Sequence, residues 1–292
     1  MAGRVRLDRQ FAAPVAGRVI SSPCDIPTVT SYSTIEYERE EATAHVRLDR
    51  PDAMNALNER LLDEFEDALD RAEADGDVRV VVVAGYGKAF SAGYDIGADE
   101  PERSVDDRIR DQRTHLEAIF SSRLPVIAAV DGPALAGGCN LALACDLTFA
   151  TERSEFGYPD MHFGEPPPKF VLPFVTDSLK HARELLYTGK TVAADEARRM
   201  GLVNRVVPDG DLGSAVDEEI EHIRKTPGAA LALVKDMVND VQETQGYRRY
   251  GRLEESLGTL TMESETATRF REIRDEEGLQ AALEWVHGTD KP

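Results

Sequence analysis

The sequence predicts an α/β fold, with strands and helices alternating in a core, followed by a helical C-terminal region. Up to about residue 175, short apolar or alternating runs typical of strands are separated by amphipathic helical segments. Beyond that point apolar residues recur at helical spacing, and only residues 203–207 have a strand pattern. A chain of 292 residues with 41% hydrophobic residues can bury a substantial core.

The first elements are predicted by the change from a period of two to a helical period. Residues 35–37 and 44–48 alternate apolar and polar side chains, which indicates two antiparallel strands. Asn58 is a good N-cap residue for the helix that follows. The apolar positions of this helix fall on one face, namely Leu62, Phe65, Leu69 and Ala72.

Three further strands are predicted in residues 78–84, 125–130 and 147–150. The first is a continuous β-branched run, which suits a strand buried on both faces of a sheet. The rest of the chain is predicted to be helical. The expected helices cover residues 178–188, 193–200, 212–225, 229–244, 248–273 and 278–286.

Three regions follow from this reading. Residues 1–30 are locally basic and are interrupted by Pro14 and Pro23, so we expect a flexible N-terminal arm. Residues 31–210 form the α/β core. Residues 211–292 form a helical region that we expect to mediate oligomerisation.

The charge balance argues against nucleic acid as a partner. The formal net charge is −20, whereas binding to phosphates demands a basic patch. The acidic residues are spread along the chain, which indicates a solvated acidic surface of the halophilic kind. No apolar run approaches the ~18 residues that indicate a membrane span, so no membrane association is expected.

The three cysteines, Cys24, Cys139 and Cys145, lack the spacing of metal ligands, and we expect no metal site. An odd number of cysteines without a secretory signal predicts reduced thiols and a cytoplasmic location. Cys139 and Cys145 lie in an apolar helical stretch. We therefore expect them to be buried packing residues and not nucleophiles.

Two of the buried strands lead into loops rich in small residues, covering residues 85–96 and 131–140. Glycine lets a backbone approach a ligand closely, and a helix start offers N–H groups at the positive end of a dipole. Two such loops at one cleft can direct two N–H donors at one oxygen, which is an oxyanion hole. Ordinary tight turns use glycine as well, and the loops match neither a P-loop nor a dinucleotide fingerprint.

Five segments, taken in order, resemble the motifs of the crotonase (enoyl-CoA hydratase/isomerase) superfamily. They are residues 48–57, Gly87-Lys-Ala-Phe-Ser-Ala-Gly-Tyr-Asp-Ile96, Ala134-Leu-Ala-Gly-Gly-Cys-Asn-Leu-Ala142, residues 156–164 and residues 193–204. The resemblance extends over about residues 34–286. It implies a core of repeated ββα units, homotrimers or dimers of trimers, and an acyl-CoA thioester of fatty acid metabolism as the substrate.

The resemblance also implies site residues. The backbone N–H groups of Tyr94 and Gly137 would form the oxyanion hole, and backbone groups of Ala92 and Ile96 would hold the CoA adenine. CoA is part of the substrate, so no separate cofactor is expected. The implied substrate-binding residues are Arg50, Lys88, Ala92, Gly93, Asp95, Ile96 and Gly138, of which the two basic residues are CoA phosphate contacts or solvated surface charges.

The acid/base residues depart from the family pattern. Family hydratases use two glutamates, and here Asn140 occupies the first position and Asp160 the second. Asparagine cannot exchange a proton at neutral pH but can orient a water, whereas Asp160 can act as a general base or acid. The structural alternatives are a helix N-cap for Asp160 and a polar residue satisfying the backbone for Asn140.

Several other side chains are weaker candidates. Glu165 and His162 are alternative acid/base residues, and the Tyr94 phenol is an alternative lining of the acyl pocket. His115 is too far from the motifs in sequence to be assigned. Phe270, like Trp285, is expected to be a helix-packing or subunit-interface residue.

The expected function is an enoyl-CoA hydratase that adds water to a 2-enoyl-CoA. A single carboxylate at Asp160 would also suffice for an enoyl-CoA isomerase, and a hydrolase or decarboxylase on the same scaffold is a further alternative. An inactive acyl-CoA-binding subunit is the alternative from another class. Loss of the first glutamate favours the inactive subunit, whereas the retained acid and glycine loops favour an enzyme.

Overall fold

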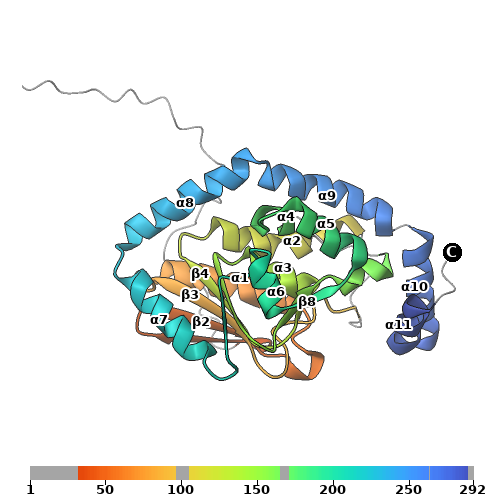
Figure 1. The fold of residues 1–292 in the computed structure, drawn as a ribbon, viewed down its shortest axis with the longest axis horizontal. Helices are drawn as coiled ribbons and strands as arrows, with labels where there is room; N and C mark the ends of the chain where they lie inside the picture. The colour runs from red at the N-terminus through yellow and green to blue at the C-terminus, as the bar shows by residue number, and fades with distance from the viewer. Residues whose placement is uncertain (1–31, 97–104, 165–170, 263, 289–292) are drawn as a thin grey trace, which may run out of the picture. The chain divides into compact units, whose positions relative to one another are not determined.

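The computed structural model describes residues 32–96, 105–164, 171–262 and 264–288. The chain divides between Ser31 and Tyr32, and its second unit, Tyr32–Pro292, is compact. The predicted N-terminal arm lies outside the described residues. The second unit contains a six-stranded sheet, a three-stranded sheet and the helices (Figure 1). None of the helices in its described part is long and apolar enough to cross a membrane.

The main sheet has the strand order β1-β2-β3-β4-β6-β9. Strands β1 and β2 are antiparallel, as predicted, and the remaining pairs are parallel. Parallel neighbours need long crossovers, which the intervening helices supply. The strands are β1 (Ile35–Glu40), β2 (Thr43–Leu48), β3 (Val80–Gly85), β4 (Val126–Val130), β6 (Leu147–Thr151) and β9 (Arg205–Val207).

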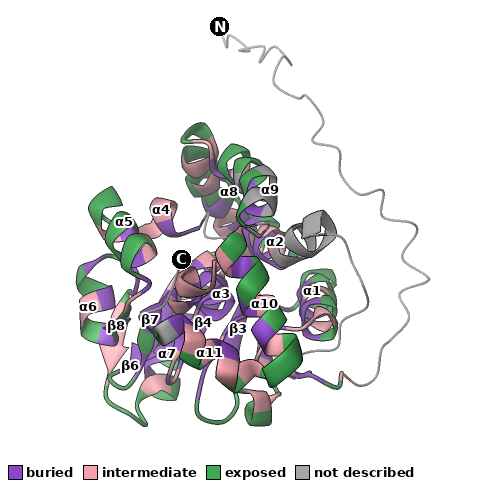
Figure 2. Cartoon of the chain, turned by 90° about the vertical axis from the view of Figure 1, so that its right-hand side faces the viewer, coloured by how far each residue is buried: buried purple, intermediate pink, exposed green. Residues whose placement is uncertain are grey.

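The two faces of this sheet pack against different helices (Figure 2). Val81 and Val83 belong to one core cluster, whereas Val80 and Val82 belong to the other. Successive side chains of a strand alternate between faces, so the β-branched run is buried on both, as predicted. Helices α1 (Glu59–Ala74), α2 (Val105–Ser121) and α3 (Gly137–Ala144) contribute to the first cluster, and α7 (Leu212–Arg224) contributes to the second.

Helix α1 begins where the sequence predicts. The Asn58 side chain accepts a hydrogen bond from Leu61 N at 3.0 Å, which is the expected N-cap contact. The four apolar positions used for the prediction are all among the buried residues of this helix.

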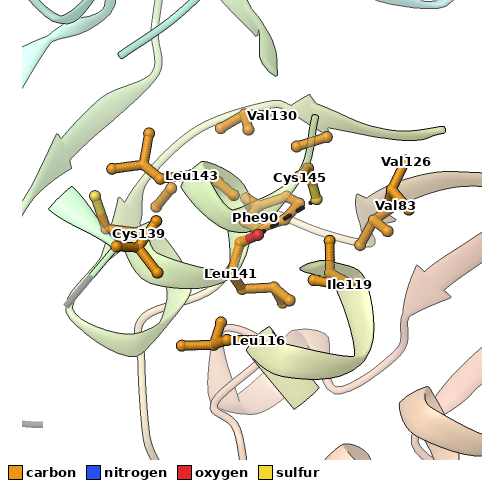
Figure 3. Close-up of a cluster of buried hydrophobic side chains, with 14 of the residues drawn as sticks. Val83, Phe90, Leu116, Ile119, Val126, Val130, Cys139, Leu141, Leu143 and Cys145 are labelled. Carbon is orange, nitrogen blue, oxygen red and sulfur yellow. Dashed lines mark hydrogen bonds between the residues drawn. The ribbon is translucent and has the colours of Figure 1, made fainter. Parts of the chain in front are cut away.

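The two described cysteines are packing residues of the first core cluster (Figure 3). Cys139 is fully buried, Cys145 is 7% exposed, and neither forms a disulfide. Burial raises the pKa of Cys145 far above that of an exposed thiol, and its Sγ donates to Leu141 O at 3.3 Å. A thiol that is held protonated is a poor nucleophile, in agreement with the predicted packing role.

The C-terminal helices agree with the sequence prediction except at one break. The predicted helix over residues 248–273 is wrong, because the chain forms two helices there. Ser264 caps the second helix, and its Oγ accepts from Ala267 N at 3.3 Å. The α-helices not yet given are α4 (Leu172–Val175), α5 (Leu179–Thr188), α6 (Ala194–Arg199), α8 (Gly228–Thr244), α9 (Tyr247–Met262), α10 (Glu265–Glu277) and α11 (Leu279–His287).

Helix α8 is anchored to the core by a buried cation. Lys235 is 7% exposed, and its Nζ donates to Asp146 Oδ2 at 2.7 Å, Ile119 O at 2.9 Å and Leu124 O at 3.0 Å. These three acceptors match the three donors of an ammonium group. The buried side of α8 is therefore fixed on the end of α2, while its other side remains exposed.

A second, smaller sheet was not predicted. It consists of β5 (Ala134–Leu135), β7 (Glu155–Gly157) and β8 (Thr191–Ala193), in the order β5-β7-β8. Strands of two or three residues are too short to show a period in the sequence. This sheet nevertheless places the second glycine loop beside the segment that carries Asp160.

Candidate active site

A short backbone ladder joins the two glycine loops. Ser91 of the first loop forms an isolated parallel bridge with Ala134 of the second. Leu135 N donates to Ser91 O at 2.9 Å, and Ser91 N donates to Pro133 O at 3.2 Å. The loops, which lie far apart in the sequence, are thereby held side by side.

A second isolated bridge fixes the other side of the first loop. Leu57 N donates to Gly93 O at 2.8 Å, and Asp95 N donates to Leu57 O at 3.0 Å. In a parallel bridge of this kind, the residue between the two bonded groups directs its own N–H away from the partner. Tyr94 is that residue, so its N–H points away from Leu57.

The far side of Tyr94 is where α3 begins. A Cβ placed on Gly93 would lie 2.8 Å from Ala136 Cβ and 3.1 Å from Gly137 N. Gly137 is the first residue of α3, and the first N–H groups of a helix have no acceptor within it. The N–H groups of Tyr94 and Gly137 thus come from adjoining segments, at the positive end of a buried helix.

This close approach depends on residues without side chains and on one strained residue. Gly93 has φ +102°, and a Cβ on Gly138 would lie 2.6 Å from Ser91 Cβ. Ala136, at the N-cap of α3, has φ 50° and ψ −120°, a backbone conformation that residues with a Cβ rarely adopt. Its N–H donates to Gly157 O at 2.8 Å, which ties the strained turn to β7.

The Tyr94 ring covers the start of α3. A Cβ on Gly137 would lie 2.7 Å from Tyr94 Cδ2 and 2.9 Å from Cζ. The fully buried His115 of α2 lies edge-on to this ring, with centroids 6.2 Å apart. His115 is far in sequence from the motifs and was not assigned, although its spacing of four residues from Ile119 predicts a shared helix face, and both side chains are fully buried.

Asn140 is fully buried and contacts a residue that the sequence analysis did not single out. Its Oδ1 accepts a hydrogen bond from the Tyr158 hydroxyl at 2.9 Å, and Tyr158 is also fully buried. A buried amide needs hydrogen-bond partners. The hydroxyl of Tyr158, next to Pro159, was therefore a candidate partner that the sequence already offered. The contact joins α3 to the segment that carries Asp160.

Asp160 is 7% exposed and lies in the short 3₁₀ helix η2 (Pro159–Phe163). Tyr158 occupies the N-cap position and makes no side-chain capping bond, so the N-cap alternative for Asp160 is wrong. Because β7 pairs with β5, the chain enters η2 directly beside the second glycine loop. The acid/base role of Asp160 stays a prediction.

Of the two alternative acid/base residues, only His162 is described. Its Nε2 lies 2.8 Å from Thr188 O, and because a carbonyl can only accept, Nε2 carries the proton and donates. The imidazole therefore binds the last turn of α5. Glu165 lies outside the described residues.

Arg50 and Asp95, both predicted to bind substrate, contact each other. Arg50 Nη2 lies 2.8 Å from Asp95 Oδ2, and Arg50 Nη1 donates to Ala56 O. The buried Asn55 donates to Tyr86 O and Ala89 O at 2.9 Å each. These contacts tie residues 50–57 to the first glycine loop, and a phosphate contact by Arg50 remains a prediction.

Lys88, Ala92 and Ile96 are the other predicted CoA contacts. Lys88 is exposed. Ala92 N donates to Met54 O at 2.9 Å, which leaves the Ala92 carbonyl as the backbone group for a ligand. The Ile96 carbonyl accepts from Arg274 Nη1 at 3.3 Å.

Comparison with known proteins agrees with this architecture. A family model described as enoyl-CoA hydratase/isomerase matches residues 38–283. A probable enoyl-CoA hydratase of Rhizobium meliloti is 38% identical over 233 residues, covering 78% of this chain and 90% of that protein. A crotonyl-CoA hydratase of Syntrophomonas wolfei is 35% identical over 226 residues, covering 73% and 84%.

Solved structures show the same fold. An enoyl-CoA hydratase/isomerase from Xanthobacter autotrophicus Py2 superposes with a TM-score of 0.83 at 35% identity, covering 88% of this chain and 98% of that one. An enoyl-CoA hydratase from Mycobacterium smegmatis, at 22% identity, has a TM-score of 0.81 and supports the fold alone. The expected crotonase-like fold is thereby confirmed.

Proposed function

Because the chain belongs to the enoyl-CoA hydratase/isomerase family, we propose that it binds a CoA thioester and adds water to a 2-enoyl-CoA. The observation that carries this proposal is the backbone ladder between the glycine loops. It sets the N–H groups of Tyr94 and Gly137 on adjoining segments, in the manner of an oxyanion hole. The family relatives named as hydratases support the same reaction.

The chemistry follows from the charge that develops on the thioester oxygen. Water forms a bond to Cβ, and the electrons of the double bond shift toward the carbonyl to give an enolate. Asp160 takes a proton from the water, and a proton then returns to Cα. Two preorganised donors stabilise the enolate oxygen, and loss of one such donor typically costs about 3 kcal/mol. The reaction consumes no cofactor, since CoA stays bound to the acyl group.

One observation favours an isomerase as the second candidate. Asn140 stands where a second carboxylate would be, and its Oδ1 accepts from the Tyr158 hydroxyl within the core. An amide cannot exchange a proton at neutral pH. Moving a double bond from C3 to C2 needs only one group that removes a proton from Cα and returns it to Cγ, which Asp160 alone could supply.

The proposal is tested by replacing Asp160 with asparagine. Asp160→Asn keeps the size and polarity of the side chain but removes proton exchange, so turnover should fall roughly 100-fold or more. Rates on crotonyl-CoA and on a 3-enoyl-CoA distinguish hydratase from isomerase. Asp195→Asn, on the exposed surface of α6, is the matched control and should keep the wild-type rate. Full activity of Asp160→Asn on both substrates would remove Asp160 from the mechanism.

The chain is further proposed to act as a homotrimer or a dimer of trimers. Supporting this, helices α8 and α9 expose apolar side chains at helical spacing, which a partner subunit would cover. These side chains are Leu233, Val234, Met237, Val238 and Val241 on α8 and Tyr250, Leu253 and Leu257 on α9, each between 39% and 62% exposed.

A reducing compartment, the cytoplasm, is proposed for the same protein. Cys139 and Cys145 are buried on the same short stretch of chain without forming a disulfide. A pattern of reduced, buried cysteines is typical of proteins kept in reducing surroundings.

Of the described residues, no group of three His, Cys, Asp or Glu side chains is arranged to hold a metal.

A further inference from the structure

Helices α10 and α11 pack against each other beside both halves of the site. Their buried residues, which include Phe270 and Ile273, form a separate apolar cluster. Two residues from elsewhere in the chain pack against this cluster, Ile96 at the end of the first glycine loop and Phe163 at the end of η2. Figures 1 and 2 show α10 and α11 side by side.

The contact with η2 is an aromatic stack. The rings of Phe163 and Phe270 are nearly parallel, with an interplanar angle of 4° and centroids 4.9 Å apart. Phe270 is fully buried. The next residue, Gly164, lies against the start of α10, since a Cβ there would be 3.1 Å from Ala267 N and 3.3 Å from Ser264 Oγ. The C-terminal end of η2 thus rests on α10.

The contact with the first glycine loop is polar. Arg274 Nη1 donates to the carbonyl of Ile96 at 3.3 Å, and Arg274 is also paired with Asp275 at 2.8 Å. Ile96 is two residues after Tyr94, so this bond fixes the backbone that leaves the oxyanion hole. Arg274 and Phe270 lie one helical turn apart on α10.

A segment such as η2 needs external support. It is a single 3₁₀ stretch of five residues, and such short helices have poor hydrogen-bond geometry. Other contacts of this segment are those of Tyr158, at its N-cap, with Asn140 of α3 and of His162, within it, with Thr188 of α5. Helix α10 contacts both η2 and the end of the first glycine loop, through Phe270 and Arg274.

We propose that Phe270 and Arg274 are positioning residues of the active site. Phe270 sets the position of Asp160 through Phe163, and Arg274 sets the backbone of Ile96 at the end of the first glycine loop. Phe270 thereby holds the proton-transferring carboxylate beside the two N–H donors, whereas Arg274 holds backbone that contacts the CoA part of the substrate. The proposal rests on the function proposed above, because it assigns the proton transfer to Asp160.

The first test replaces the stacked ring by an aliphatic side chain of similar bulk. Phe270→Leu should lower kcat on crotonyl-CoA about 10- to 100-fold with little change in KM, because a small displacement of a catalytic group costs rate and not binding. In an Asp160→Asn background the same change should have no further effect, because residues that act as a unit are non-additive. A further loss of similar size in that background would show that Phe270 does not act through Asp160.

Replacement of Arg274 is expected to change KM and not kcat. Arg274→Met removes the donor to Ile96 and should raise KM for crotonyl-CoA several-fold while kcat stays near wild type. Arg274→Lys keeps a donor and should restore most of the affinity. An unchanged KM for Arg274→Met, or equal losses for methionine and lysine, would remove Arg274 from substrate binding.

The control separates positioning from general loosening of the helix pair. Val286→Ala removes apolar volume from the same cluster on α11 without touching the stack, and it should keep kcat within about twofold. Trp285, the only tryptophan, packs on this cluster, and its fluorescence reports whether the pair remains docked in each variant.

Hydrogen exchange keeps the test independent of the reaction. Phe270→Leu should increase exchange in residues 158–164 even if crotonyl-CoA is not the substrate. If Asp160→Asn is fully active, the assignment of proton transfer to Asp160 fails, and if the wild type hydrates no 2-enoyl-CoA, the proposed function fails. If instead Asp160→Asn loses activity while Phe270→Leu keeps both its rate and its exchange protection, the positioning role alone is overturned.

Discussion

At Gly93, the lack of a side chain lets two segments of the chain meet. The residue has φ +102°, and a Cβ would collide with Ala136 Cβ at 2.8 Å and Leu135 O at 3.0 Å. Both atoms belong to the segment that leads into Gly137. A methyl group at position 93 must therefore push the first glycine loop away from the second.

Gly93→Ala should lower turnover about 100-fold, because the two N–H donors would no longer converge on one oxygen. The strained backbone should also lower the free energy of unfolding by ~1–3 kcal/mol. Steady-state kinetics on crotonyl-CoA and urea denaturation measure the two effects. In Gly76→Ala a Cβ meets nothing within 4 Å, so this control should change neither quantity. Wild-type turnover in Gly93→Ala would show that the loop spacing does not control the reaction.

Tyr158 acts at the same scale through one hydrogen bond. Tyr158→Phe removes the donor to Asn140 Oδ1 in a fully buried environment. The free energy of unfolding should fall by about 1–3 kcal/mol, the usual cost of depriving a buried acceptor of its partner. Urea denaturation checks this, with Tyr187→Phe, 80% exposed, as the control that should behave like wild type.

At the scale of elements, one carboxylate on α1 holds the beginning of β1. Glu64 accepts hydrogen bonds from the backbone N–H groups of Ser33 and Thr34, from the Thr34 hydroxyl at 2.6 Å and from Arg60. Burial raises the pKa of Glu64, but these hydrogen bonds outweigh it and lower the pKa from 4.5 to about 2. The edge strand of the main sheet is thereby tied to the helix that covers it.

The hydrogen bonds of Glu64 should make the free energy of unfolding depend on pH in the acidic range. Because the pKa of Glu64 is lower in the folded state, its contribution is complete above pH 4.5 and is lost as the pH falls toward about 2. Glu64→Gln should flatten the pH dependence of the free energy of unfolding in that window. Denaturation curves between pH 2 and pH 5 measure it, and Glu152→Gln, at an exposed position, is the control. An unchanged slope in Glu64→Gln would assign the acid sensitivity to other carboxylates.

At the scale of the whole molecule, strong negative charge accompanies an exposed apolar helix face. The formal net charge is −20, while Met237 and Val238 of α8 are 62% and 58% exposed. Burial of this face between subunits would release water from apolar surface. Repulsion between acidic subunits opposes that association, and salt screens the repulsion.

Assembly should therefore strengthen as the salt concentration rises, and light scattering across ionic strength measures this. Met237→Glu places a charge in the centre of the apolar face and should shift the protein toward the monomer. Leu179→Glu adds the same charge at an exposed position of α5 and should leave assembly unchanged. A monomer at every salt concentration would contradict the proposed trimer.

The sequence alone determined most elements that have a clear period. The buried run at Val80–Gly85, the cap at Asn58 and the pattern of C-terminal helices all appeared because local spacing reports which face of an element is buried. The ordered motifs likewise indicate the family, because they are a property of the sequence alone. The prediction of one continuous helix over residues 248–273 is wrong, because Ser264 caps a new helix although the apolar spacing continues across it.

The tertiary structure decided what the site contains. Contacts such as Ser91 with Ala134, Tyr158 with Asn140 and Phe163 with Phe270 join residues whose separation in sequence carries no periodic signal. The strands of the β5–β7–β8 sheet are too short to be predicted, yet this sheet sets the second glycine loop beside η2, and the Ser91–Ala134 bridge adds the first loop. Local propensity acts over a few residues, whereas a site is assembled by long-range pairing, so only the fold could show which groups converge.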